Sequence, residues 1–204
     1  MTETNRIYVY LFDKLDSLEE NFVSENIYRL PVFRREQCLK YQKESDKKAC
    51  ILAYRLLEKG LAERYGTVNP ISFVYNENGK PYLREYPDIF FSISHSESSV
   101  ICALADFEIG ADIESIRPYD MKMAELICGD DELEQLSVSD APERLFCRFW
   151  TEKESYAKAK GDGVAHALKH NMGELGFLYI DAADYLITIY HGKSDIPILC
   201  LGTV

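Results

Sequence analysis

The sequence lacks several features, and each absence argues against a class of protein. Its 204 residues contain no apolar run near the roughly 18–20 residues that a membrane-spanning helix needs, so we expect no membrane segment. Lysine and arginine (23) are outnumbered by aspartate and glutamate (34), and the net charge of -11 argues against nucleic-acid binding, which requires a basic surface. No glycine-rich phosphate loop of the Gly-x4-Gly-Lys-Ser/Thr type is present, which disfavours the common nucleotide phosphotransferases and hydrolases.

The cysteines form no Cys-x-x-Cys pair, and most of the six lie among apolar residues, as Cys102 does in the stretch 100–104. This distribution is typical of reduced thiols in a core and disfavours disulfides or zinc sites. The first ten residues carry polar and charged side chains before a short apolar run. We therefore expect no signal peptide and a cytoplasmic location.

What is present indicates a folded α+β protein, with 47% hydrophobic and 12% aromatic residues. Ser17 followed three residues later by Glu20 predicts a helix start with a capping box. Apolar spacing predicts further helices over 33–41, 46–65, 121–128, 131–136 and 143–160. Runs rich in β-branched and aromatic residues predict strands over 7–12, 71–75, 90–93, 100–105, 109–114, 175–180, 185–190 and 196–201, of which the pair 175–180 and 185–190 should form a hairpin.

The order of these elements nearly recurs, although the sequence itself shows no repeat. In each half a long helix ends at a glycine, Gly66 or Gly161, and strands that look antiparallel follow. We therefore predict two similar halves with a pseudo-twofold relation, residues 1–107 and 108–204. Each would be a small antiparallel sheet packed with helices, with the active site at their interface.

Asp112 and Glu114 are the first residues that indicate chemistry. They stand two apart in a predicted strand, so both project from one face while Ala111 and Ile113 project from the other. Two neighbouring carboxylates repel each other, and burial of either is costly without a counter-charge. A divalent cation resolves this conflict, and Mg²⁺ commonly binds one or two carboxylates together with substrate phosphates.

Glu154 and Lys158 form a second charged pair, one turn apart on a predicted helix. Such a pair is usually a solvated salt bridge. Here Trp150 lies on the same stripe, one turn before Glu154, so the charged pair continues an apolar face. Glu154 can then act as a third metal ligand, and Lys158 can reach a phosphate oxygen.

Four motifs occur in one order: Gly-Lys-Pro at 79–81, Phe-Ser-Ile-Ser-His-Ser at 91–96, Gly-Ala-Asp-Ile-Glu at 110–114 and Trp-Thr-Glu-Lys-Glu-Ser-Tyr-Ala-Lys at 150–158. Each motif alone is weak, but their order and approximate spacing resemble those of the 4'-phosphopantetheinyl transferases of the surfactin-synthetase-activating type. The resemblance covers roughly residues 34–163.

The resemblance implies a Mg²⁺ site, with Mn²⁺ as an alternative, whose ligands Asp112, Glu114 and Glu154 hold the metal together with the pyrophosphate of coenzyme A. It implies phosphate contacts from Lys158, Lys80, Ser94 and His95. More loosely, it implies nucleotide-phosphate contacts from Arg34, Lys43, Lys47 and Lys48. Glu132, or a water molecule on the metal, would be the general base.

Taken from the residues alone, several of these positions have ordinary alternatives. His95 can be a loop histidine bonded to backbone, and Lys80 can be a turn lysine after Asn-Glu-Asn-Gly. The Arg34/Arg35 and Lys47/Lys48 pairs are both typical of solvated helix faces.

The implied activity is transfer of the 4'-phosphopantetheine arm of coenzyme A to a serine of an acyl or peptidyl carrier protein, with release of 3',5'-ADP. The pathway is left open among fatty-acid, polyketide and nonribosomal-peptide synthesis, and we expect a monomer. Met121, Met123, Leu126 and Ile127 are equally well explained as a carrier-docking surface or as core. The alternatives are a regulatory module that binds coenzyme A or a nucleotide without transfer, and another Mg²⁺-dependent phosphotransferase or hydrolase.

Overall fold

The computed structural model describes residues 5–66, 71–173 and 175–202 of the chain. It has an α+β fold, as expected. Its helices are α1 (Phe22–Asn26), α2 (Val32–Leu39), α3 (Glu44–Tyr65), α4 (Met121–Ile127), α5 (Asp130–Val138) and α6 (Pro142–Lys160). Its strands are β1 (Arg6–Phe12), β2 (Phe73–Tyr75), β3 (Pro81–Leu83), β4 (Phe90–His95), β5 (Val100–Ala105), β6 (Gly110–Ser115), β7 (Phe177–Asp181), β8 (Tyr185–Tyr190) and β9 (Ile198–Gly202).

These strands form two main sheets and a small ribbon. One sheet has the order β4-β5-β1-β9, the other has the order β6-β8-β7, and β2 pairs with β3 alone. Neighbouring strands are antiparallel except for β9, which runs parallel to β1 with Ile198 opposite Arg6. The last strand of the chain therefore completes the sheet that the first strand belongs to.

The two main sheets pack face to face. Along each strand, successive side chains point alternately to the face between the sheets and to the outer face. Ile101 and Ala103 of β5 lie in one apolar cluster with Ala111 and Ile113 of β6. The residue between the first two, Cys102, lies in a different cluster, on the outer face of its sheet. This is the two-residue period expected of strands that are covered on both faces.

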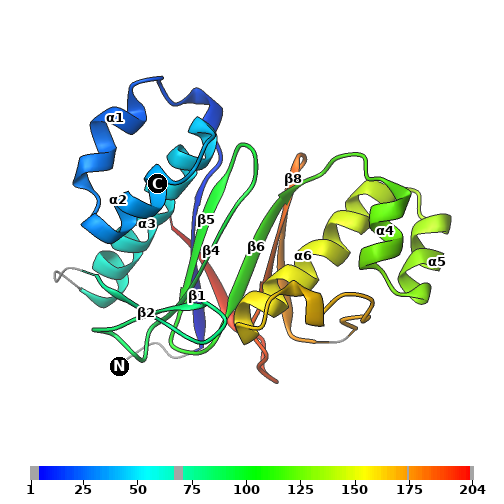
Figure 1. Ribbon diagram of the computed structural model, residues 1–204. Helices are drawn as coiled ribbons and strands as arrows, with labels where there is room; N and C mark the ends of the chain where they lie inside the picture. Colours follow the sequence, from blue (N-terminus) through cyan, green and yellow to red (C-terminus); the bar gives the residue numbers. More distant parts are fainter. Residues whose placement is uncertain (1–4, 67–70, 174, 203–204) are drawn as a thin grey trace.

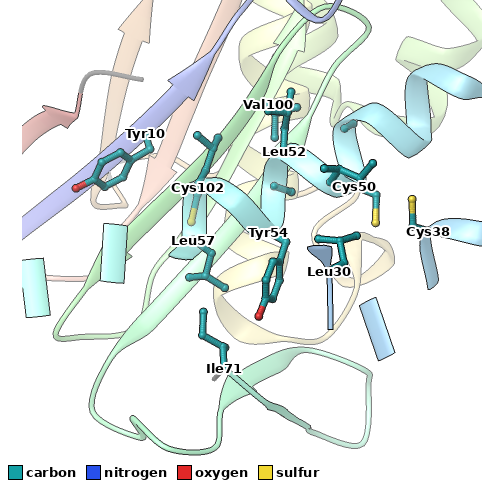
Figure 2. Packing of buried hydrophobic residues seen from close by; sticks show 14 of the residues in the cluster. Tyr10, Leu30, Cys38, Cys50, Leu52, Tyr54, Leu57, Ile71, Val100 and Cys102 are labelled. Carbon is teal, nitrogen blue, oxygen red and sulfur yellow. The ribbon is translucent and has the colours of Figure 1, made fainter. Parts of the chain in front are cut away.

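A long helix covers the outer face of each main sheet (Figure 1). The helix α3 buries Leu57 and Leu61 against the first sheet, together with Leu104 of β5. Figure 2 shows this cluster, in which Leu57 and Tyr54 lie between Cys102 and Ile71. The helix α6 covers β6 and β8 of the second sheet in the same way.

Gly110 determines how closely α6 can approach β6. A Cβ atom at this position would lie 1.9 Å from the backbone oxygen of Ser155 and 2.5 Å from the backbone nitrogen of Ala159. Only glycine fits between the strand and the helix backbone here. The close approach brings the side chains that follow on β6 next to those of α6.

Most of the predicted elements are confirmed, including the hairpin of β7 and β8 and the two glycine helix ends, where Gly66 and Gly161 adopt positive φ angles of 63° and 72°. The capping box at Ser17 is wrong, because Ser17 ends a short 3-10 helix and α1 begins only at Phe22. The division at residues 107 and 108 and the pseudo-twofold relation stay predictions, and β9 carries C-terminal residues into the first sheet.

None of the helices in the described part of the chain combines the length and apolar character that a bilayer crossing requires.

Candidate active site

The two carboxylates of β6 project from its outer face toward α6, as the alternation predicts. Ala111 and Ile113 are buried between the sheets, whereas Asp112 and Glu114 line a hollow of about 370 Å³. Asp112 is only 4% exposed. The floor of the hollow is therefore acidic, and it lies where β6 meets β4.

The helix α6 contributes Glu154 and Lys158 to the same hollow. The Lys158 ammonium nitrogen lies 2.6 Å from Oδ1 of Asp112 and donates a 2.9 Å hydrogen bond to the Ser94 hydroxyl. Ser94 in turn donates to Oδ1 of Asp112 over 2.6 Å. Lys158 thus pairs with the strand carboxylate, and the structure shows no Lys158–Glu154 ion pair among the residues it describes.

Burial raises the pKa of Glu154, and the charges of Asp112 and Glu114 raise it further, while Lys158 lowers it. Burial also raises the pKa of Glu114, against the opposing effect of Arg117. The Arg117 guanidinium lies 3.7 Å from the Glu114 carboxylate and 3.1 Å from that of Glu97. Both glutamates are therefore costly to hold ionised, and an added cation would relieve that cost.

Asp112, Glu114 and Glu154 supply the oxygen donors that Mg²⁺ prefers. Their shared hollow and the raised pKa values of both glutamates fit a divalent cation in kind. Within the described ranges, however, no three His, Cys, Asp or Glu side chains are grouped closely enough to hold a metal ion. The donor set fits the metal only if the side chains around Asp112 rearrange, and both Lys158 and Ser94 are in direct contact with it.

A second pocket of about 410 Å³ adjoins the hollow and is shared between elements of both predicted halves. Residues of α2, α3, β3 and β4 line it on one side, and Glu154, Lys158 and Gly161 of the α6 region line it on the other. Its cationic and histidine side chains are Arg34, Lys80, His95 and Lys158. The pocket is therefore suited to an elongated ligand with anionic groups at the end next to the carboxylates.

Arg34 is the best placed of the predicted nucleotide contacts. Its guanidinium donates to the Gln37 side chain and to the Cys50 carbonyl, and its Nε is buried without a partner. The Arg34 side chain also lines the pocket, so its guanidinium is the kind of group that can bind an anionic ligand there.

The lysines predicted to assist it lie elsewhere. Lys47 pairs with Glu44, Lys48 donates to the Leu18 carbonyl, and neither of these lysines nor Lys43 lines the pocket. The alternative of a solvated helix face describes Lys47 better than a phosphate contact does.

Lys80 and His95 both line the pocket, but they differ in exposure. Lys80 is mostly buried and donates to the Ala159 carbonyl at the end of α6, and burial lowers its pKa. His95 ends β4, which runs further than predicted, and it is an exposed residue. Lys80 thus ties the β2–β3 hairpin to α6, where Asn76 also donates to the Gly161 carbonyl.

Glu132 is not part of this site. It is fully buried, and both of its carboxylate oxygens accept hydrogen bonds from Lys153, at 2.6 and 2.8 Å. It also accepts from the backbone N–H of Gly129 and so caps the start of α5. These bonds explain its burial fully, and its position offers no support for the predicted role as general base.

Two contributors escaped the sequence reasoning, Ser92 and Arg117. The Ser92 hydroxyl accepts from the backbone N–H of Ala111 over 2.8 Å and so ties β4 to β6. Its signal was available, because Ser92 and Ser94 stand two apart in an apolar strand and therefore share a face. Arg117 contacts Glu114, three residues before it, and also Glu97, which is 20 residues away and whose pairing with it had no signal in the sequence.

An apolar groove of about 660 Å³ begins beside Glu114 and runs along α4. Met123, Leu126 and Ile127 line it together with Trp150, which also borders the metal hollow. Met121, Met123 and Leu126 are half exposed or more, at 55%, 51% and 62%, while Ile127 is buried. Each of the two explanations of this segment, core or carrier-docking surface, therefore holds for some of its residues. Ile127 belongs to the core, and the other three are exposed enough to contact a partner.

Comparison with known proteins points to one family. Residues 108–197 match the family model described as the 4'-phosphopantetheinyl transferase superfamily. A 4'-phosphopantetheinyl transferase of Bacillus subtilis is 32% identical over 136 residues, covering 65% of this chain and 60% of that protein. The 4'-phosphopantetheinyl transferase Sfp of Bacillus subtilis strain 168 is 31% identical over 168 residues, covering 78% of this chain and 72% of its own length.

The 4'-phosphopantetheinyl transferase gsp of Aneurinibacillus migulanus is 32% identical over 161 residues, which are 78% of this chain and 66% of that protein. The matched part of the chain thus spans between 60% and 72% of the length of these three relatives.

Proposed function

The chain belongs to the 4'-phosphopantetheinyl transferase superfamily, and on that basis we propose that it transfers the phosphopantetheine arm of coenzyme A to a serine of an acyl or peptidyl carrier protein. In this reaction the serine oxygen forms a bond to the β-phosphorus of the pyrophosphate. The bond from that phosphorus to the bridging oxygen breaks, and 3',5'-ADP leaves. The reaction needs Mg²⁺, or Mn²⁺ in its place, and the enzyme acts as a cytoplasmic monomer.

One observation carries the proposal: an acidic hollow and a pocket with cationic side chains share Glu154 and Lys158. A pyrophosphate needs positive charge on its phosphoryl oxygens and a divalent cation across them. The adjoining 410 Å³ pocket gives the nucleotide end of coenzyme A a place next to the Arg34 side chain. The two features therefore suit the two ends of one substrate.

Asp112, Glu114 and Glu154 would hold the metal ion, which when bound supplies charge neutralisation to the transferring phosphoryl group. Lys158 supplies a further positive charge to the phosphate oxygens and compensates the charge that develops on the leaving nucleotide. Arg34 and His95 line the pocket that would orient the nucleotide. The chain's own contribution is thus mainly positioning and electrostatic stabilisation, as is general for phosphoryl transfer.

Of the two bases that the resemblance implies for the serine proton, a water molecule on the metal ion would remain. Glu154 would hold the metal ion, and a carboxylate bound to a divalent cation is a poor proton acceptor. Glu132 is left with a structural role, because Lys153 and Gly129 occupy its carboxylate.

The carrier protein would bind along the apolar groove, because that groove begins at Glu114 and ends on exposed side chains of α4. A protein seated there reaches the carboxylates without crossing the nucleotide pocket. Met123 and Leu126 would be its main apolar contacts.

The test is mass spectrometry of candidate carrier proteins after incubation with coenzyme A and Mg²⁺. Wild-type enzyme should add one phosphopantetheine arm and release one 3',5'-ADP per carrier. Asp112→Ala should add none while remaining folded, and Glu134→Ala, which removes an exposed carboxylate of α5, should behave as wild type. Equal transfer by wild type and Asp112→Ala would contradict the assignment.

Two other functions give different results in the same experiment. A regulatory module would bind coenzyme A and leave its arm in place with every carrier tried. A different Mg²⁺-dependent phosphotransferase or hydrolase would release inorganic phosphate and no 3',5'-ADP.

A further inference from the structure

The Lys158 ammonium is bound to an oxygen of Asp112, one of the carboxylates that would hold a metal ion. Oδ1 of Asp112 receives the Lys158 ammonium at 2.6 Å and the Ser94 hydroxyl at 2.6 Å, and Lys158 also donates to Ser94. Asp112 is 4% exposed, so little water competes for this arrangement. Three side chains from β4, β6 and α6 therefore form one closed hydrogen-bonded group.

A divalent cation and the Lys158 ammonium compete for Asp112. Mg²⁺ lies about 2.0–2.1 Å from its ligand oxygens. With the ammonium still bound to the same carboxylate, the two positive charges would lie within a few ångströms of each other in a poorly hydrated hollow, where repulsion is strong. Occupation of Asp112 by one of them therefore opposes occupation by the other.

The Lys158 side chain can also reach the nucleotide pocket. Its side chain is 30% exposed and borders the nucleotide pocket as well as the acidic hollow. A phosphate group in the pocket would offer the ammonium new acceptor oxygens without moving the helix backbone.

We propose that Lys158 gates entry of the divalent cation: it holds Asp112 until a phosphate-bearing substrate in the pocket draws it away. The cation therefore binds weakly to the protein alone and strongly when coenzyme A is present. This inference rests on the proposed function for the identity of the pocket ligand. By linkage, the cation improves coenzyme A binding by the same factor as coenzyme A improves cation binding.

Mn²⁺ binding provides a test that needs no turnover. Free Mn²⁺ is measured by electron paramagnetic resonance in titrations of the protein with and without coenzyme A, and with no carrier present. Lys158→Ala should bind Mn²⁺ without coenzyme A about tenfold tighter than wild type or better, since it removes a competing charge from Asp112. Its gain in Mn²⁺ affinity on adding coenzyme A should shrink accordingly.

Two variants serve as controls. Lys158→Arg keeps the positive charge and should resemble wild type. Lys160→Ala removes a lysine from the same helix whose ammonium lies over the rings of Tyr156 and Tyr190, each 5.6 Å away, and should leave Mn²⁺ affinity unchanged. If Lys160→Ala gains as much affinity as Lys158→Ala, general charge explains the effect and the gate is refuted.

Ser94→Ala provides a second route if Lys158→Ala does not fold. It removes one of the two bonds that hold the ammonium, so Mn²⁺ affinity without coenzyme A should rise, by less than in Lys158→Ala. Equal affinities of wild type and both variants would overturn the gate.

The gate and the proposed function can fail separately. If Mn²⁺ affinity rises in Lys158→Ala but no carrier gains a phosphopantetheine arm, the gate stands and the transferase assignment falls. If carriers are modified but Lys158→Ala binds Mn²⁺ no tighter than wild type, the assignment stands and the gate falls.

Discussion

The closeness of β6 and α6 leads to a prediction for Gly110→Ala. The new Cβ atom would lie 1.9 Å from the Ser155 backbone oxygen, whereas an ordinary contact is at least 3.4 Å. The strand and the helix must therefore separate by about 1.5 Å, the difference between these two distances. Neither neighbour is a flexible side chain, so the shift must move backbone.

This separation should reduce stability and activity together. Overpacking of a close-packed core costs about 1–3 kcal/mol, and a backbone clash places Gly110→Ala near 3 kcal/mol. For a chain of this size that lowers the melting temperature by about 6–12 °C. The same shift pulls Asp112 away from Lys158, now 2.6 Å apart, and a misplacement of about 1 Å can reduce a catalytic rate about 100-fold.

The assay is thermal unfolding followed by circular dichroism, together with the rate of arm transfer to a carrier. Gly66→Ala is the matched control, because its Cβ would meet no atom of the described residues within 4 Å and its expected cost comes from the positive φ of 63°. It should lose about 1 kcal/mol of stability and keep its transfer rate. If Gly110→Ala unfolds within about 1 kcal/mol of wild type and transfers at full rate, the reasoning about this contact is refuted.

Four further predictions follow from the same structure. Glu132→Gln should lose about 3–5 kcal/mol in denaturant unfolding, because it leaves Lys153 buried without a counter-charge; unchanged stability with a lost transfer rate would instead restore Glu132 as general base. Glu154→Gln should stabilise the protein at pH 7 in a chelating buffer. The folded-state pKa of Glu154 is raised above its ordinary value of 4.5, so wild type loses stability as pH rises through that window; a gain that persists below pH 4.5 would exclude this cause. Arg34→Met should weaken coenzyme A binding about tenfold in calorimetry, whereas Lys47→Met should not. Equal losses in both variants would show that coenzyme A does not bind in the pocket lined by Arg34. Leu126→Glu should raise KM for the carrier and leave coenzyme A affinity unchanged. The control is Val138→Glu, an exposed substitution outside the groove. If both variants raise KM equally, the carrier does not dock in the groove.

The sequence by itself determined the features that depend on local periodicity. Alternation in β6 places Asp112 and Glu114 on one face, and the helical period places Glu154 and Lys158 on one stripe of α6. Glycines at positive φ end α3 and α6 where expected, since few other residues adopt that conformation without strain. These rules act over a few residues, so they can be applied to the sequence before any fold is known.

Only the tertiary structure decided which of these residues meet. Lys158 pairs with Asp112, 46 positions earlier, instead of with Glu154 on its own helix. Glu132 forms a buried ion pair with Lys153. The strand β9 pairs with β1 although nearly the whole chain separates them. Long-range partners follow from how sheets and helices pack against one another, and the spacing of residues along the chain carries no information about that packing.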